Sequence, residues 1–279
     1  MFAVAIGFFA LLLFGLPHAS FLLLALCSTA AAAVGALETA ALLRSRQLQP
    51  EGGLAAFGAA LLPAAAYAEN LMPVTAARVG GFLVMAFALV ALLVMATTLA
   101  AARDQARLAS ILPRAVATSF AALYPALGIV FIVKLGAFPG AQWVFLAFFV
   151  AVFGNDTAAY VAGTLVRGRT ALRLAVSPRK TAIGYAFGLA ASIAAVAGLS
   201  SWFPTELGFG TLEIVGAGVA IGIAAPAGDL LESALKRSAT VKDSGHIIPG
   251  RGGLLDSIDS LLPAAPMFYY ILRLAGAAN

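Results

Sequence analysis

Long apolar runs separated by short polar segments dominate the chain. A membrane-spanning helix needs about 20 apolar residues, each rising about 1.5 Å, to cross roughly 30 Å of hydrocarbon, and slightly shorter runs are accommodated by local thinning. The pattern predicts an all-α fold, a polytopic integral membrane helical bundle with about nine transmembrane helices. The runs cover residues 2–16, 20–43, 54–68, 79–100, 115–134, 142–165, 183–201, 212–235 and 254–274.

The spacing of these runs predicts one continuous membrane domain. No polar linker or low-complexity segment interrupts it, so we expect N-terminal transmembrane helices over 1–140 and a region richer in charged loops over 141–279. Gly and Ala are frequent inside the runs, which lets helix backbones approach closely. The first run lacks a basic leading segment, and we expect an uncleaved span there instead of a signal peptide.

Composition supports a membrane protein and excludes several other classes. Of the 279 residues 62% are hydrophobic and 10% are charged, and the mean hydropathy of +0.99 lies outside the range of soluble domains. The net charge of +5 is spread over short loops, which argues for membrane topology and against a nucleic acid partner. The single cysteine, Cys27, excludes an intrachain disulfide.

Basic residues follow every second predicted span, and Lys and Arg favour cytoplasmic loops. This alternation predicts a multi-pass protein of the cell inner (plasma) membrane, with its N-terminus inside, its C-terminus outside and its charged loops facing the cytoplasm. The residues concerned are Arg44 and Arg46; Arg103, Arg107 and Arg114; Arg167, Arg169, Arg173, Arg179 and Lys180; and Lys236, Arg237, Lys242 and Arg251.

Two polar clusters precede and follow the cytoplasmic end of the sixth span. Asp156 and Tyr160 lie inside the span, where an acidic residue is a functional candidate or forms a buried hydrogen bond between helices. Ser177, Lys180 and Thr181 stand just before the seventh span, where hydroxyls, a cation and free N–H groups suit a phosphate. The alternative is an ordinary basic loop that contacts lipid headgroups.

The third and densest cluster runs from Gly228 to Ser260. Asp229, Glu232 or Ser233, and Lys236 are spaced to share one face of the eighth span. Asp256 and Asp259 are spaced to share one face at the start of the ninth. The segment between them, Lys242 to Gly253, contains Pro249 and four glycines, and is therefore expected to be a loop whose backbone closely approaches a ligand.

Carboxylates on both sides of a basic, glycine-rich loop suit Mg²⁺ held jointly by protein and phosphate oxygens. Each residue also has a structural interpretation: Asp256 as a helix N-cap, and Glu232 with Lys236 as a surface ion pair. The patterns of zinc proteases, serine hydrolases and Walker A loops are absent from the sequence.

At these residues the sequence resembles the phosphatidate cytidylyltransferases, also called CDP-diacylglycerol synthases. The resemblance covers about residue 150 to the end and includes DTxAY-like and SPxKTxxG elements at 156–160 and 177–184. The C-terminal signature is carried by Ser233, Lys236, Arg237, Lys242, Asp243, Gly245, Ile248, Pro249, Gly250, Gly252, Gly253, Asp256 and Asp259.

The resemblance implies transfer of CMP from CTP to phosphatidate, with Mg²⁺ as cofactor and 141–279 as the catalytic region. It also allows a monovalent cation such as K⁺ beside the magnesium and a homodimer. Catalysis is assigned to Asp229, Lys236, Arg237, Lys242, Asp243, His246, Asp256 and Asp259, and the metal to Asp229, Asp256 and Asp259. Substrate binding is assigned to Asp156, Tyr160, Ser177, Lys180, Thr181, Glu232, Ser233, Arg251, Gly252 and Gly253.

Two positions inside the signature depart from the family pattern. Arg251 stands where the family usually has His, and Ser257 where it usually has Arg; outside the signature, Ile183 stands where an acidic or amide residue is common. We hypothesise that Arg251 restores the positive charge missing at 257.

Two other functions remain open at this point. One is a related CTP-dependent lipid enzyme, such as a polyprenol or phytol kinase or another CDP-lipid synthase. The other is a secondary transporter with Asp156, Asp229 and Lys236 as coupling groups, although the two halves show no evident inverted repeat.

Overall fold

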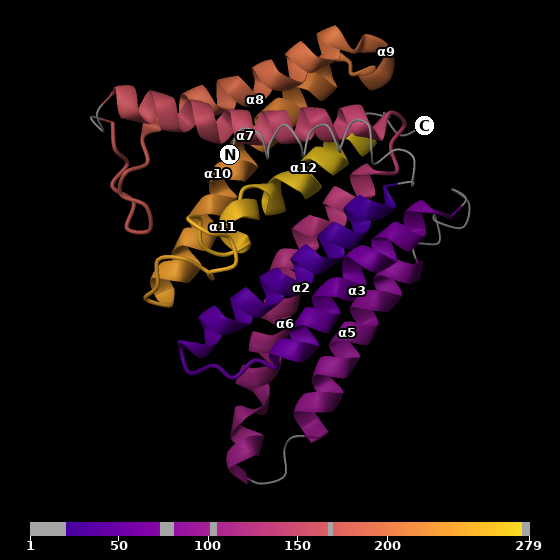
Figure 1. Ribbon diagram of the computed structural model, residues 1–279, viewed down its shortest axis with the longest axis vertical. Coiled ribbons are helices and arrows are strands. Elements are labelled where there is room, and N and C mark those ends of the chain that lie inside the picture. The colour runs from indigo at the N-terminus through magenta and orange to yellow at the C-terminus, as the bar shows by residue number, and fades with distance from the viewer. Residues whose placement is uncertain (1–20, 73–80, 101–104, 167–169, 275–279) are drawn as a thin grey trace. The chain divides into compact units, whose positions relative to one another are not determined.

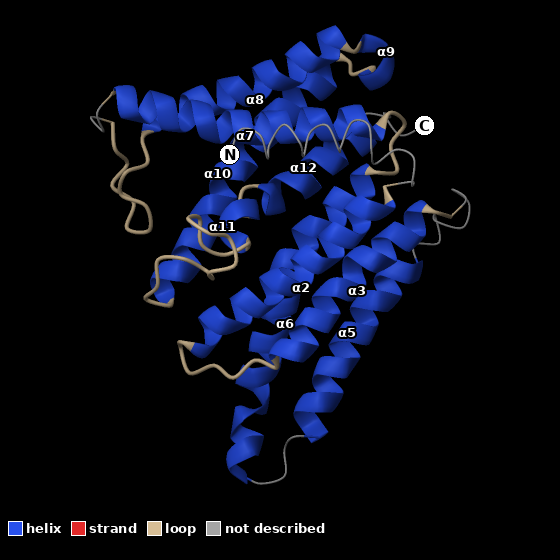
Figure 2. Cartoon of the chain, in the orientation of Figure 1, coloured by secondary structure: helices blue, strands red, loops and turns tan. Residues whose placement is uncertain are grey.

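The structure is a computed structural model that describes residues 21–72, 81–100, 105–166 and 170–274. Within these ranges the chain is α-helical and contains no strand (Figure 2). Two isolated β-bridges, Ala171 with Thr181 and Ile248 with Gly252, connect residues within loops and do not form a sheet. The predicted fold class, an all-α membrane protein, is confirmed.

Six helices of the described residues are long and apolar enough to cross a membrane. Four other helices are present, α3 (Gly52–Asn70), α9 (Pro204–Leu207), α11 (Leu255–Ile258) and α12 (Leu261–Leu274). The six long helices are α2 (Leu22–Arg44), α5 (Gly81–Ala100), α6 (Gln105–Leu135), α7 (Ala141–Leu165), α8 (Ala182–Trp202) and α10 (Thr211–Ser238) (Figure 1).

The predicted count of about nine spans is not confirmed. The first predicted span, 2–16, lies outside the described residues, and the third corresponds to α3, a helix of 19 residues. The ninth is wrong as one helix: α11 and α12 are separated at Asp259 and Ser260, where Asp259 Oδ1 accepts a hydrogen bond of 2.6 Å from the Ser260 N–H. Asp256 and Asp259 therefore do not share the first turn of one helix.

The chain forms two compact units, the first made of residues 1–22, 134–234 and 258–279 and the second of 23–133 and 235–257. The chain passes from the second unit into the first after Val133, and α10 passes from the first into the second after Ala234. The loop that follows α10 thus belongs to the unit formed by the N-terminal helices.

Small residues bring the helices of the first unit together. The helices α7 and α8 pack along each other, and a Cβ at Gly188 of α8 would lie 3.0 Å from the Asn155 side-chain oxygen. A Cβ at Gly218 of α10 would lie 2.5 Å from the Cα of Ile193 in α8. The predicted close approach at Gly and Ala positions is confirmed here.

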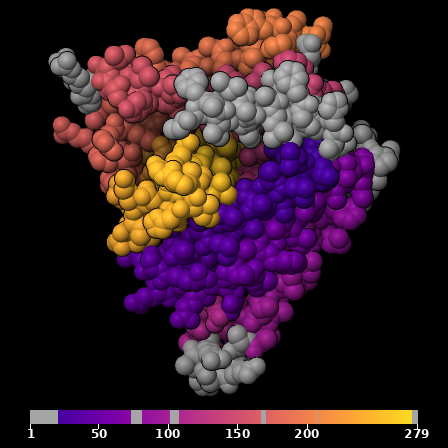
Figure 3. All heavy atoms as spheres, viewed as in Figure 1, coloured from indigo at the N-terminus to yellow at the C-terminus, as the bar shows by residue number. Residues whose placement is uncertain are grey.

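The second unit contains α2, α3, α5 and most of α6. The helix α3 packs on α5, and α2 meets α6 at Gly35, where a Cβ would lie 2.9 Å from Pro125. The outer side of α5 leaves large apolar side chains exposed, including Met85 and Leu92, as a lipid-facing helix does. The indigo and purple segments of this unit form a broad surface in Figure 3.

Candidate functional site

The segment between α10 and α11 is a loop, as predicted, and it folds back on itself at Ile248 to Gly252. The Ile248 N–H donates to the Gly252 carbonyl (2.9 Å) and the Gly252 N–H to the Ile248 carbonyl (3.0 Å). Gly250 and Gly252 have φ of 77° and 107°, a region that disfavours residues with a Cβ. The glycines of the signature at these two positions are thus required by the turn itself.

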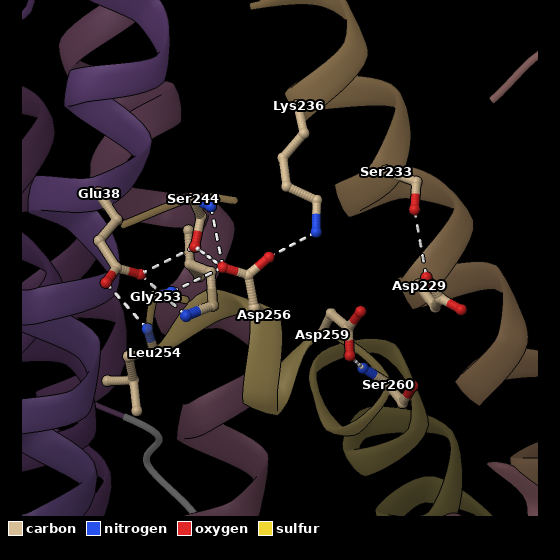
Figure 4. Close-up of polar contacts among 11 residues, drawn as sticks. Glu38, Asp229, Ser233, Lys236, Ser244, Gly253, Leu254, Asp256, Asp259 and Ser260 are labelled. Atoms are coloured by element: carbon tan, nitrogen blue, oxygen red, sulfur yellow. Dashed lines mark hydrogen bonds and ion pairs between the residues drawn. The ribbon is translucent and has the colours of Figure 1, made fainter. Parts of the chain in front are cut away.

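Asp256, in the first turn of α11, accepts hydrogen bonds from this loop (Figure 4). Its Oδ2 accepts hydrogen bonds from the Ser244 N–H (2.8 Å), the Ser244 hydroxyl (2.8 Å) and the Gly253 N–H (2.7 Å). Its Oδ1 is paired with Lys236 Nζ at 2.5 Å, and the side chains of Lys236 and Asp256 are only 15% and 7% exposed. One carboxylate oxygen is therefore committed to the loop, and the other faces a lysine.

Burial of Asp256 opposes ionisation, but the Lys236 ammonium and the hydrogen bonds from Ser244 and Gly253 outweigh it. Together they lower the pKa of Asp256 from 3.8 to about 2. The carboxyl group is thus an anion throughout the physiological pH range, which suits a ligand for cations and excludes a general acid.

Glu38, in α2, contacts this loop, and the sequence patterns did not single it out. It is 5% exposed, and its two oxygens accept hydrogen bonds from the N–H groups of Leu254 (2.8 Å) and Leu255 (2.9 Å). Oε2 also lies 3.3 Å from the Ser244 hydroxyl. An acidic residue inside the apolar run 20–43 was the available signal, because ionisable groups in spans are costly.

Two glycines of the loop are explained by this carboxylate. A Cβ at Gly245 would lie 2.6 Å from Glu38 Oε1, and one at Gly253 would lie 2.7 Å from the same atom and 2.1 Å from Ser244 Oγ. The sequence predicted that these glycines bring the backbone close to a ligand. In the structure they bring it close to Glu38 and Ser244.

A second polar cluster lies in the first unit. Lys180 Nζ is 2.7 Å from Asp229 Oδ2 and donates to the Pro226 carbonyl at 3.3 Å. Ser233 donates to Asp229 Oδ1 at 3.2 Å, so the predicted phosphate-binding lysine and the predicted metal ligand form an ion pair. Pro226 does not interrupt α10, which is continuous to Ser238.

Thr181 has a structural role. It is 4% exposed and is the N-cap of α8, where its hydroxyl oxygen accepts a hydrogen bond of 3.0 Å from the Gly184 N–H. Ser177 is half-buried in the turn before it, which is closed by the Ser177 N–H donating to the Leu174 carbonyl. Arg167 and Arg169 at the start of this loop lie outside the described residues.

The polar group inside α7 divides into a buried and an exposed residue. Asn155 is 1% exposed and donates to Ser192 of α8 at 3.0 Å, so it forms the buried hydrogen bond between helices. Asp156 is exposed within this chain, and Tyr160 is 73% exposed. The buried hydrogen bond between helices that was considered for Asp156 is formed by its neighbour Asn155.

The other predicted residues lie on the surface of the loop or inside α10. Glu232 is fully buried, with 0% exposure, so the interpretation as a surface pair with Lys236 is wrong. Asp259 is half-buried at the turn between α11 and α12. The exposed members are Arg237, Lys242, Asp243, His246 and Arg251.

Protein side chains alone do not form a metal centre in the part of the chain that the structure describes, where no three His, Cys, Asp or Glu residues are gathered to hold an ion. Asp256 and Asp229 do supply hard oxygen donors. Such donors fit Mg²⁺, which is commonly held by one or two carboxylates together with phosphate oxygens and water.

The chain is similar to known lipid enzymes. A phosphatidate cytidylyltransferase of Synechocystis is 42% identical over 139 residues, 49% of this chain and 45% of the relative. The phosphatidate cytidylyltransferase of Bacillus subtilis is 36% identical over 135 residues, which are 48% of this chain and 49% of the relative. A chloroplastic phosphatidate cytidylyltransferase of Arabidopsis thaliana is 38% identical over 134 residues, which are 46% of this chain and 31% of the relative.

The matched segments thus span half or less of these relatives. The family model described as the cytidylyltransferase family extends much further and matches residues 1–275. The chain belongs to the cytidylyltransferase family.

Proposed function

We propose that the protein transfers CMP from CTP to phosphatidate, giving CDP-diacylglycerol and pyrophosphate. A phosphatidate oxygen forms a bond to the α-phosphorus of CTP, and the bond from this phosphorus to the bridging oxygen of the β-phosphate breaks. The family and the names of the relatives support the substrates. The observation that carries the proposal is the preorganised pair of Lys236 at the end of α10 and Asp256 in α11, on either side of the loop.

The reaction needs charge neutralisation more than a strong base. The phosphate of phosphatidate is already an anion, so catalysis depends mainly on positioning and on stabilising charge as pyrophosphate leaves. Lys236 is paired with Asp256 and Lys180 with Asp229, and each lysine would neutralise phosphate oxygens. The exposed Arg237, Lys242 and Arg251 would receive the triphosphate or the lipid headgroup from solution.

Each carboxylate predicted to hold the metal stays a candidate ligand by itself, Asp256 in the second unit and Asp229 and Asp259 in the first. When bound, Mg²⁺ would supply positive charge shared between carboxylate and phosphate oxygens. Asp256 would contribute Oδ1, because its Oδ2 already accepts three hydrogen bonds from the loop.

The proposed site faces the cytoplasm of the inner membrane. CTP is dissolved in the cytoplasm. Basic residues lie in the loop after α2, in the loop before α8 and in the loop after α10, which agrees with the preference of Lys and Arg for cytoplasmic loops. A homodimer is expected from the family resemblance, and mass measurement of the protein in nanodiscs tests it.

The test uses purified protein in nanodiscs with phosphatidate, Mg²⁺ and CTP labelled at either the α- or the γ-phosphate. We expect the α-label in the lipid and the γ-label in pyrophosphate. A CTP-dependent kinase would place the γ-label in the lipid, and a transporter would place neither label there. Either result would overturn the proposal.

Asp256→Asn tests the carboxylate that carries it. We expect transfer to fall by about 100- to 1,000-fold, the range for loss of one preorganised electrostatic group. Glu213→Gln, which changes a carboxylate in the first turn of α10, is the matched control and should retain the wild-type rate. Wild-type activity in Asp256→Asn would refute the role of this residue.

A further inference from the structure

The helix α2 binds the C-terminal end of the loop that joins α10 to α11. Glu38 lies less than two turns before the end of α2 and binds the N–H groups of Leu254 and Leu255, directly before Asp256. Burying a carboxylate is unfavourable unless donors satisfy it, and here two backbone donors do so. The contact joins residues separated by more than 200 positions in the sequence.

The turn directly after α2 also holds the beginning of the loop. The Ser45 hydroxyl lies 3.3 Å from the Ala239 carbonyl, and the Arg46 guanidinium donates to the Ser238 carbonyl. These carbonyls end α10, where basic groups and donors are favourable. The loop 239–255 is therefore held at one end by α2 and at the other by the turn that follows α2.

Ser244 links the two carboxylates in the middle. Its hydroxyl lies 2.8 Å from Asp256 Oδ2 and 3.3 Å from Glu38 Oε2. A hydroxyl has one proton to donate, and the shorter distance assigns it to Asp256. Glu38 then depends on the backbone donors of Leu254 and Leu255, and it fixes the segment from which Asp256 projects (Figure 4).

We propose that Glu38 is a positioning residue for Asp256: it binds the loop 239–255 to α2 and thereby holds Asp256 Oδ1 against Lys236. Both carboxylate oxygens of Glu38 are hydrogen-bonded to the loop, and the carboxylate does not touch substrate. Its effect on transfer rests on the function proposed above, whereas its effect on the loop does not.

Glu38→Gln tests this inference, with Glu69→Gln as its matched control. Both glutamates are buried in helices of the second unit and accept a backbone N–H, but Glu69 binds Leu83 of α5 at 2.8 Å and not the loop. Glutamine keeps the size and replaces one acceptor oxygen by an NH₂ group, which cannot accept from a backbone N–H. The two variants therefore differ in the backbone they release, that of Leu254 or Leu255 in Glu38→Gln and that of Leu83 in Glu69→Gln.

Two measurements are made on each variant in nanodiscs: hydrogen exchange of peptides covering 239–255, and the rate of CDP-diacylglycerol formation. For Glu38→Gln we expect faster exchange in 239–255 and a kcat lowered by about 10- to 100-fold with an unchanged KM for phosphatidate, as is typical when support of a metal ligand is lost. Glu69→Gln should leave both at wild-type values.

Wild-type exchange of 239–255 in Glu38→Gln, or an equal increase in Glu69→Gln, would overturn the inference. Glu38→Asp covers a failure of Glu38→Gln to fold, because it keeps the charge and only withdraws the carboxylate from the Leu254 and Leu255 N–H groups by one methylene. It should also increase exchange in 239–255, and unchanged exchange there would count against the proposal. If the wild-type protein forms no CDP-diacylglycerol, the proposed function is refuted. The exchange comparison does not depend on that function and still decides the role of Glu38.

Discussion

The two polar clusters of this protein differ in how firmly they are held. In the second unit, Asp256 is 7% exposed, and one of its oxygens accepts three hydrogen bonds from the loop. In the first unit, Asp229 is 39% exposed and is held by a serine at 3.2 Å and by Lys180. The first carboxylate has a fixed direction, whereas the second can adjust.

This difference indicates a division of labour in the proposed reaction. A rigid, preorganised charge stabilises a transition state best, because it does not have to reorganise as charge develops. An accessible ion pair is better suited to exchange its partners when an anionic substrate arrives. We therefore expect the Asp256 cluster to govern the chemical step and the Lys180–Asp229 pair to govern binding.

The largest contrast is expected between Lys236→Met and Lys180→Met. Lys236→Met leaves a buried carboxylate without its cation and should lower the free energy of unfolding by about 3 kcal/mol. Lys180→Met should lower it by about 1 kcal/mol or less, since Asp229 retains contact with water. Thermal unfolding in one detergent measures both, and equal losses would remove the contrast.

The pH dependence of stability separates the two variants further. Because the pKa of Asp256 is lowered to about 2 in the folded protein, its stabilising contribution is complete above about pH 4 and is lost as the pH falls through about 2. Lys236→Met removes the largest cause of this lowering while burial remains. The acid decline in stability should move to higher pH in Lys236→Met and stay in place in Lys180→Met. Superimposed profiles of all three proteins would contradict this.

The helices and the loop 239–255 were predictable from local sequence. Apolar runs of about 20 residues have few other structures available, and Pro249 among several glycines cannot continue a helix. The break at Asp259 was not predictable in this way, because apolar residues on both sides extend the same run. A Cβ at Gly228 would lie 2.2 Å from the Asp259 carbonyl oxygen, so tertiary packing of the first unit accompanies this break.

The members of the site were predictable, but most of their contacts were not. Lys236 and Asp256 were singled out by charge and spacing, whereas their pairing depends on how the loop folds back. Glu38 belongs to a helix that resembles the family only as an apolar span, and its partners lie more than 200 residues away. Asn155 and Asp156 are neighbours in sequence, so only the packing of α7 on α8 decides which is buried.

A smaller effect is expected at Thr181, and it tests whether this residue supports the helix or the substrate. As the N-cap of α8, Thr181→Ala should lower the free energy of unfolding by about 1 kcal/mol, while Thr181→Ser should retain it. The midpoint of thermal unfolding measures this difference. If Thr181→Ala kept full stability but raised the KM for CTP or phosphatidate, the hydroxyl would be a substrate ligand and not a cap.

The smallest effects are expected at the two departures from the signature. Arg251 is exposed at the turn of the loop, and Ser257 lies half-buried in α11. If Arg251 restores the charge missing at 257, Arg251→His should lower kcat/KM by a few-fold, about the value of one exposed charge pair. Adding Ser257→Arg should then recover the loss. The initial rate at subsaturating CTP measures it, because an exposed cation acts mainly on the approach of an anion. Full activity of Arg251→His together with no effect of Ser257→Arg would show that the two changes are independent, and the loop's charge would then be set by Arg237 and Lys242.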